Sequence, residues 1–308
     1  MVFLNSAPGA VAQGLIWGLF AIGLYISYKI LDMADLTVDG SIVTGAATFA
    51  LLLTNGVNIY LCLIASFIAG ALAGVITGLL HTAMGIPAIL SGILTQLILW
   101  SVNLKLLGGN SISIGIRSYP LLLTSSDNWK AIVVSAIFCI AVIVGLYFFF
   151  YTERGFSIKA TGDNEDMSRA QGINVSFNKV LGLAISNGIV GLSGALLAQY
   201  QHSAEINMGR GAIVYGLAAI IIGLSVSLRI MPNFVVSLIG VACGGVVYWL
   251  VYTLVLTFEV DTELLKMISA ILVAFFLAVP YLKKKYFTKQ KIFEDASELE
   301  ANKEVDNA

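Results

Sequence analysis

Three carboxylates lie close together in a short polar segment between two apolar runs: Asp32, Asp35 and Asp39. Carboxylates in apolar surroundings are costly unless they cap helices or face water. Asp39 stands where an N-cap would satisfy the free N–H groups of a helix that begins at Gly40, and Thr37 could do the same. Two compatible interpretations stay open: capping with a tight turn, or the lining of a polar route between the apolar runs.

Common catalytic and nucleotide-binding motifs are missing. The sequence has no G-x-x-x-x-G-K-[ST], so the chain cannot hold nucleotide phosphates as P-loop proteins do. The two histidines, His81 and His202, are expected at helix ends on opposite sides of the molecule, too far apart for a catalytic pair. Cys62, Cys139 and Cys243 fall singly in apolar runs, which predicts neither a disulfide nor a metal site. We therefore expect no catalysis, no bound cofactor and no ATP hydrolysis by this chain alone.

A polar loop at 152–176 carries the signature of a short helix. It has an N-cap, an acidic first turn, a basic residue near the end and a glycine stop. These residues are Asp163, Glu165, Asp166, Arg169 and Gly172. A two-turn helix is marginal by itself, so we expect another surface to pack on it. A simple connector at a membrane surface is the alternative.

The composition places the chain in lipid. Of its 308 residues, 58% are hydrophobic and only 11% are charged, and the mean hydropathy is +0.90. A soluble domain averages about 25% charged residues, so this composition is that of an all-α polytopic membrane protein. Nucleic acid is not an expected partner.

About nine transmembrane helices are predicted from apolar runs separated by turn residues. Two of them, 40–54 and 211–228, are short and follow polar segments, as half-helices do. The nine spans are 10–31, 40–54, 58–80, 87–104, 130–151, 177–201, 211–228, 232–257 and 263–281.

Basic residues predict the orientation. With the C-terminal tail in the cytoplasm, twelve Lys and Arg lie inside and five lie outside, which favours an external N-terminus. The inside set is Lys29, Arg154, Lys159, Arg169, Lys179, Arg229, Lys283, Lys284, Lys285, Lys289, Lys291 and Lys303. The charged tail, 282–308, is expected to be solvated.

Two halves of the chain repeat at a constant offset of 171 positions. Gly40–Ala47 matches Gly211–Ala218 without a gap, Ser66 matches Ser237, and Gly74 matches Gly245. Helices 1–4 (about 10–105) and 6–9 (about 177–281) thus form candidate repeats. The single linking helix 130–151 makes the second repeat enter the membrane from the opposite face. Inverted repeats with interrupted helices are typical of transporters.

The repeat predicts where a solute would pass. The N-termini of the two half-helices should meet near the pseudo-symmetry axis, where free N–H groups favour an anionic group such as an amino acid carboxylate. Polar side chains around that point form the predicted pathway. They are Thr37, Asp39, Ser41, Thr44, Ser91, Thr95, Asn207 and Tyr215.

Several segments resemble one family: the permease subunits of bacterial ABC importers of the branched-chain amino acid, sugar and nucleoside permease superfamily, and within it those of tryptophan and tyrosine uptake systems. The segments that carry the resemblance are 30–41, 77–82, 88–95, 101–104, 160–165 and 193–201.

The resemblance implies a type II ABC importer permease domain over 1–281, in the bacterial plasma membrane. Two permease copies, most simply a homodimer, would form the pore. Separate ATPase subunits would hold ATP-Mg, and an extracellular lipoprotein would deliver the solute. The loop 152–176 would be the coupling loop, contacting the ATPase through Asp163, Asn164, Glu165, Asp166, Arg169 and Gly172.

Other functions stay open. The solute could be an aromatic amino acid, a nucleoside, a sugar or a branched-chain amino acid. A membrane-embedded enzyme could use Asp32, Asp35 or Asp39 as an acid or metal ligand, and an ion-coupled secondary transporter would also show inverted repeats. The middle of almost every span is free of charge, which disfavours both of these.

Overall fold

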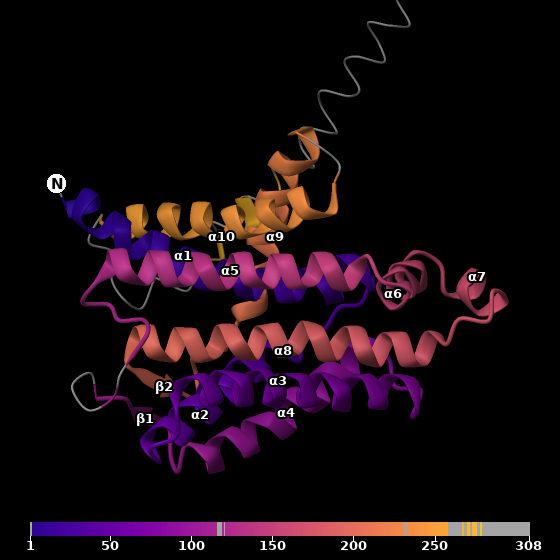
Figure 1. Ribbon diagram of the computed structural model, residues 1–308, viewed down its shortest axis with the longest axis horizontal. Helices are drawn as coiled ribbons and strands as arrows, with labels where there is room; N and C mark the ends of the chain where they lie inside the picture. Colours follow the sequence, from indigo (N-terminus) through magenta and orange to yellow (C-terminus); the bar gives the residue numbers. More distant parts are fainter. Residues whose placement is uncertain are drawn as a thin grey trace, which may run out of the picture. The chain divides into compact units, whose positions relative to one another are not determined.

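The chain forms two compact units, Met1–Val260 and Asp261–Ala308. All the helices labelled in Figure 1 that are discussed below belong to the first unit. The predicted ninth span, 263–281, lies largely outside the described residues. The computed structural model describes residues 2–115, 119, 121–230, 233–257, 267, 270, 271, 273–275 and 278.

Six helices in the described part of the chain are long and apolar enough to cross a membrane. Two further apolar segments are shorter, as predicted for half-helices: Val38–Thr54, which is α2, and Ala212–Ser225 within α9. The all-helical membrane fold is thereby confirmed, and eight of the nine predicted spans coincide with helices. The six long apolar helices are α1 (Val2–Tyr25, continued by the π-helical turn η1, Ile26–Ile30), α3 (Ile59–Thr82), α4 (Ala88–Leu106), α5 (Asn128–Phe150), α8 (Val175–Gln201) and α10 (Phe234–Leu256). The two helices with the shorter apolar segments are α2 (Val38–Thr54) and α9 (Ala212–Ile230).

The two ends of the helical bundle carry different small elements. At one end, strands β1 (Ser111–Ser113) and β2 (Ser203–Glu205) pair antiparallel, with Ser111 opposite Glu205. At the opposite end lie α6 (Glu153–Asp163) and α7 (Glu165–Ala170), as Figure 1 shows. We call these the strand end and the α7 end.

The contacts between helices agree with the predicted repeat. Shifting α1, α2 and α3 by 171 positions brings them onto α8, α9 and α10 to within a few residues. α3 packs on α8, and the equivalent pair, α10 on α1, also packs. α1 runs toward the α7 end, whereas α8 runs back toward the strand end (Figure 1), so equivalent helices enter from opposite sides.

Equivalent glycines make the equivalent contacts. A Cβ on Gly74 of α3 would collide with the Leu183 carbonyl oxygen of α8. A Cβ on Gly245 of α10 would lie 2.8 Å from the Gly14 carbonyl oxygen and from the Gly18 backbone of α1. Helices in lipid gain packing energy by such close backbone approach, since apolar side chains alone give them no preference over lipid tails.

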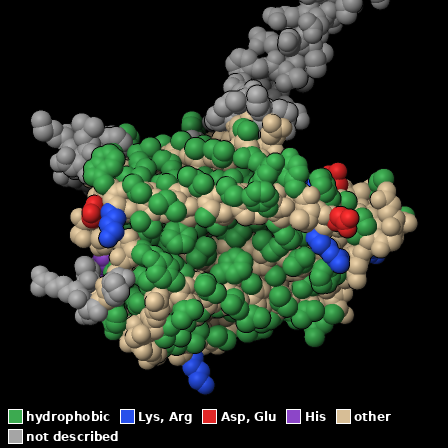
Figure 2. All heavy atoms as spheres, in the orientation of Figure 1, with side chains coloured by type: hydrophobic (Ala, Val, Ile, Leu, Met, Phe, Trp, Pro, Cys, Tyr) green, Lys and Arg blue, Asp and Glu red, His purple; other side chains and the backbone are tan. Residues whose placement is uncertain are grey.

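The outward faces of α3, α4 and α5 are apolar. Exposed residues such as Leu72, Ile98 and Ile140 recur along them. Hydrophobic side chains cover most of the face in Figure 2, and its few charged side chains lie mainly toward its ends. This surface is suited to the hydrocarbon core of a bilayer.

The close contact at Gly74 makes a testable prediction. Gly74→Ala should lower the thermal midpoint of the detergent-purified protein, because the added methyl group forces α3 away from α8, at a typical overpacking cost of about 1–3 kcal/mol. Thermal unfolding followed by size-exclusion chromatography measures the change.

Gly145→Ala is the matched control, because a Cβ at Gly145 in α5 has no atom within 4 Å. Alanine favours a helix over glycine by roughly 1 kcal/mol, so this variant should be neutral or stabilised. Equal midpoints for the two variants would contradict the packing argument.

Candidate functional site

The two half-helices meet through one carboxylate. Asp39, in the first turn of α2, accepts hydrogen bonds from the backbone N–H groups of Gly211 (3.0 Å) and Ile213 (2.8 Å) at the start of α9. The N-termini of α2 and α9 therefore lie together, where the repeat places them. A carboxylate at a helix N-terminus satisfies free donors and complements the helix dipole.

This arrangement corrects the expected role of Asp39. α2 begins at Val38, its N-cap is Thr37, and neither Thr37 nor Asp39 caps it through a side chain. Asp39 instead caps the half-helix of the other repeat, because the free N–H groups of α9 face it across the junction. The N-terminus of α9 therefore already has an anionic partner from within the chain.

The junction lies well inside the bundle. Gly209 packs against the Asp39 carbonyl oxygen, and Gly194 of α8 packs against the Ile42 carbonyl oxygen. Gly194 is seven residues before the end of α8, which is roughly 10 Å along the helix axis. Asp39 is one turn deeper than Ile42, so the junction belongs to the membrane-spanning region.

A buried polar network stands beside the junction. The Ser41 hydroxyl donates to Asn187 Oδ1 (2.6 Å), and Asn187 Nδ2 donates to Asp35 Oδ2 (2.7 Å). The other Asp35 oxygen accepts the Thr37 backbone N–H (2.9 Å). All four residues are buried. Asp35 thus links the segment before α2 to the middle of α8.

Threonines extend the network to two more helices. The hydroxyls of Thr37 and Thr77 are 2.6 Å apart, and Thr77 donates to Thr95 (2.9 Å). Thr95 also bonds the Ser91 carbonyl oxygen one turn earlier in α4. The chain of hydrogen bonds therefore joins α2, α8, α3 and α4.

Three network residues, Asp35, Asn187 and Thr77, are absent from the predicted pathway, although Asp35 belongs to the carboxylate segment that the sequence singled out. Asn187 is an amide near the middle of a long apolar helix. Polar side chains at that depth are costly and usually mark a functional or packing contact, so the sequence contained a usable signal. The sequence around Thr77 gave no such signal, because isolated threonines are common in membrane-spanning helices.

The side chains of the remaining predicted pathway residues do not join this network. Thr44 bonds its own helix at the Gly40 carbonyl oxygen, and the Ser91 hydroxyl bonds the Ala88 carbonyl oxygen. Asn207 is exposed in the segment between β2 and α9. Tyr215 packs edge-on against Trp17 at 5.5 Å between ring centroids.

The loop at the α7 end contains two helices, where the sequence predicted one. α6 ends at Asp163, and Asn164 is the N-cap of α7, accepting the Met167 N–H at 2.9 Å. The expectation that Asp163 caps the short helix is therefore wrong by one residue. Asn164 has an extended backbone, as N-caps do, whereas Asp163 is still helical. Gly172 adopts the predicted left-handed conformation, with φ +79°.

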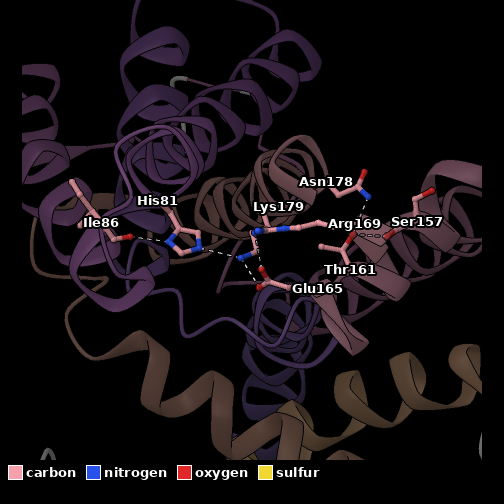
Figure 3. Close-up of polar contacts among 8 residues, drawn as sticks. All are labelled: His81, Ile86, Ser157, Thr161, Glu165, Arg169, Asn178 and Lys179. Atoms are coloured by element: carbon pink, nitrogen blue, oxygen red, sulfur yellow. Dashed lines mark hydrogen bonds and ion pairs between the residues drawn. The ribbon is translucent and has the colours of Figure 1, made fainter. Parts of the chain in front are cut away.

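Glu165 fixes α7 to the bundle. Its carboxylate pairs with Lys179 of α8 at 2.5 Å and with Arg169 one turn along α7 at 3.5 Å. Lys179 Nζ also lies 3.2 Å from His81 Nε2, and His81 Nδ1 lies 2.8 Å from the Ile86 carbonyl oxygen. Figure 3 shows this chain of contacts, which ties α7 to α8 and to the turn after α3.

α6 is held by neighbouring contacts. Asn178 Nδ2 of α8 donates to the Thr161 hydroxyl at 2.9 Å. The Lys159 ammonium lies over the Phe234 ring, 4.2 Å from its centroid, and partial burial lowers the pKa of Lys159 below its ordinary value. The loop is therefore structured and packed on the bundle.

Inverted repeats and half-helices that meet inside the bundle are typical of membrane transporters. No group of three metal-ligating side chains occurs among the described residues. The chain belongs to the family described as branched-chain amino acid transport system / permease component, which matches residues 8–277.

Relatives support the same class. The tyrosine transport system permease protein of Clostridioides difficile is 35% identical, over 89% of this chain and 91% of the relative. A probable branched-chain amino acid transport permease protein, LivH, of Methanocaldococcus jannaschii is 25% identical over 89% of this chain and 90% of that protein. The ribose import permease protein RbsC of Escherichia coli K12 is 22% identical over 71% and 69%.

The fold also resembles a solved structure. A chain of PsaBC from Streptococcus pneumoniae in complex with Fab matches with a TM-score of 0.50 at 15% identity, covering 94% of this chain and 96% of that one. The likeness concerns the arrangement of the helices.

The buried network makes a second prediction. Asn187→Leu should destabilise the protein, because it leaves Asp35 Oδ2 and the Ser41 hydroxyl without a hydrogen-bond partner. Each unsatisfied buried group typically costs about 1–3 kcal/mol. Thermal unfolding of the purified protein measures the effect.

Asn55→Leu is the matched control. Asn55 is exposed at the other end of α2, and its side chain bonds only within its own helix. A midpoint for Asn187→Leu as high as that of Asn55→Leu would argue against the network as a stabilising element.

Proposed function

We propose that this chain is the membrane subunit of an ABC importer for an amino acid, in the first place tyrosine or tryptophan. The observation that carries the proposal is the 35% identity to a tyrosine transport permease over nearly the whole of both chains. Relatives named for ribose and branched-chain amino acid transport make a sugar or a branched-chain amino acid the alternatives. A nucleoside is a further alternative from the family resemblance noted in the sequence.

The proposal includes the rest of the transporter. Two copies of the chain form the pore, separate ATPase subunits hold ATP-Mg, and an extracellular lipoprotein delivers the solute. The α7 end faces the cytoplasm of a bacterial cell and the N-terminus lies outside. Arg154, Lys159, Arg169 and Lys179 gather at the α7 end, and the positive-inside rule supports this orientation.

We propose that the ATPase contacts α7 and its flanks, 163–172. Several side chains there are free to meet a partner: Met167 is 61% exposed, and the Arg169 side chain is 63% exposed. A six-residue helix would not be stable alone, so its packing on α8 through Glu165 and Lys179 keeps it in place.

Helix α8 supplies a route from the ATPase to the solute. Lys179 holds α7, and Asn187, eight residues further on, holds Ser41 and Asp35. Eight residues span about 12 Å of one continuous helix. A displacement of α7 would therefore move the N-terminal end of α2.

The solute route is proposed to pass the junction of α2 and α9. The eight predicted pathway positions remain a proposal. Asp39 supports this proposal most directly, because it borders a cavity at the junction. Thr37, Ser41 and Thr95 are buried and belong to the polar network beside the junction.

Uptake measurements test the function. Proteoliposomes containing the permease, its co-expressed ATPase and its binding protein should accumulate labelled tyrosine or tryptophan only when ATP is enclosed. Accumulation of ribose or leucine in place of the aromatic amino acids would assign the transporter to another solute. Accumulation without ATP would contradict the ABC mechanism.

Crosslinking tests the coupling surface. In a Cys243→Ser background, a cysteine at Met167 should crosslink to the ATPase, because α7 is proposed to lie in a groove of that subunit. Trp129→Cys is the matched control, since Trp129 is 72% exposed at the start of α5, near the strand end. Crosslinking at Trp129 and none at Met167 would reverse the proposed orientation.

Charge reversal tests the ion pair itself. Glu165→Lys should reduce ATP-dependent uptake at least about tenfold, because two facing cations push α7 away from α8. Adding Lys179→Glu restores the opposite charges and should recover much of the uptake. Glu153→Lys, at the exposed start of α6, should leave uptake unchanged. An uptake defect in the single variant without recovery in the double variant would count against the Glu165–Lys179 pair as the transmitting contact.

A further inference from the structure

A cavity of about 350 Å³ lies at the junction of the half-helices. It is bordered by α2, α4 and the segment between β2 and α9, and its volume falls at the lower end of the roughly 300–1,000 Å³ range of small-molecule sites. Its polar lining residues are Asp39, Gln96, Asn103 and Arg210.

Two opposite charges face this cavity. Asp39 and Arg210 both line it, and neither forms a salt bridge with another residue in the described part of the chain. The Arg210 guanidinium lies over the Trp100 ring, 5.3 Å from its centroid. Asp39 uses its oxygens for two backbone N–H groups, and a carboxylate can accept about four hydrogen bonds, so it can take further donors.

The two charges occupy equivalent positions of the repeat. Asp39 and Arg210 differ by 171 positions, the same offset that relates Gly40 to Gly211. The pseudo-symmetric junction therefore presents an anion from one repeat and a cation from the other, which gives the cavity a negative side and a positive side and no net charge.

A buried amide adds an unused acceptor. Asn103 is 1% exposed and lines the cavity, and its Nδ2 donates to the Gly40 carbonyl oxygen at 3.3 Å, which fixes the orientation of the amide. Its Oδ1 is buried and has no hydrogen-bond partner among the described residues. An unsatisfied buried acceptor is costly, so a donor from a ligand would relieve it.

Lipid is an unsuitable neighbour for this cavity. Unpaired charges at membrane depth are strongly unfavourable against hydrocarbon and mark water-filled pathways. The rest of the wall is apolar or aromatic apart from the backbone of Gly40, and its side chains are those of Trp100, Ile93, Leu97, Val43 and Ile206. The cavity thus combines one charge of each sign with an apolar surface.

We infer that this cavity is a binding site for a zwitterionic α-amino acid inside the permease. The ligand carboxylate pairs with Arg210, its ammonium group donates to Asp39 and Asn103 Oδ1, and its apolar side chain lies along Trp100, Ile93 and Leu97. The inference rests on the proposed amino acid importer and adds a site that selects the zwitterion during passage, separate from the selection by the delivering protein.

Binding to the full-length permease in lipid nanodiscs tests the inference, without ATPase or delivering protein. The probes are labelled L-tyrosine, tyramine, which lacks the carboxylate, and 3-(4-hydroxyphenyl)propionate, which lacks the ammonium group. L-Tyrosine should bind at least about tenfold more tightly than either analogue, since a lost charged hydrogen bond typically weakens binding by that factor or more.

Two variants test which residues bind the carboxylate and which bind the ammonium group of the ligand. Arg210→Gln should weaken L-tyrosine binding at least about tenfold and leave tyramine unaffected, because tyramine has no carboxylate. Asn103→Leu should weaken L-tyrosine and tyramine together. Lys105→Gln is the matched control, since Lys105 is an exposed cation in the last turn of the same helix and does not line the cavity.

The outcomes separate this inference from the proposed function. No measurable L-tyrosine binding, or equal binding by Arg210→Gln and Lys105→Gln, would overturn the site even if ATP-dependent uptake of tyrosine is observed. Failure of uptake in the complete transporter, together with the predicted binding pattern in nanodiscs, would leave the site and overturn the importer.

Discussion

The satisfaction of backbone donors inside the membrane is the constraint on which the rest of this structure depends. A helix that begins in the bilayer interior exposes N–H groups that lipid cannot satisfy. The start of α9 meets this requirement through the Asp39 carboxylate of α2. This side chain therefore joins the starts of the two half-helices, and both starts lie beside the same cavity.

The fold is pseudo-symmetric, but its chemistry is not. Shifting the polar network by 171 positions replaces Asp35 by Ile206 and Thr77 by Tyr248, and it replaces Asn187 by Ile16. In that half an aromatic cluster, in which Tyr215 contacts Trp17 and Tyr248, fills the corresponding region. Hydrogen bonds thus join α2 to α8, α3 and α4, whereas aromatic packing joins α9 to α1 and α10, so the region around the junction is asymmetric within each chain.

Helix α8 connects α7 with the polar network beside the junction. Its tight packing favours movement of the whole helix as one rigid unit. Glycines of α3 lie against its backbone, and Gly191 packs on the Ser66 carbonyl oxygen, so α8 has little room to bend. Its first turns carry Lys179 and Asn178, which hold α7 and α6, and its middle carries Asn187. Under the coupling proposed above, a displacement of the loop would reach the junction as a small rigid movement of α8.

Several features of this protein were determined by the sequence alone, because they follow from local patterns. Apolar length predicts eight helices that the structure describes, the 171-residue offset predicts the inverted pairing, and the residues around Glu165 predict α7 apart from a one-residue error at its cap. The contacts between residues that are distant in the sequence could not be predicted in this way. The sequence predicted that Asp39 caps α2. Only the tertiary structure shows that its carboxylate binds the free N–H groups at the start of α9 instead. Arg210 and Asn103 became candidate ligand-binding residues for the same reason, since a cavity is formed by segments that are distant in the chain.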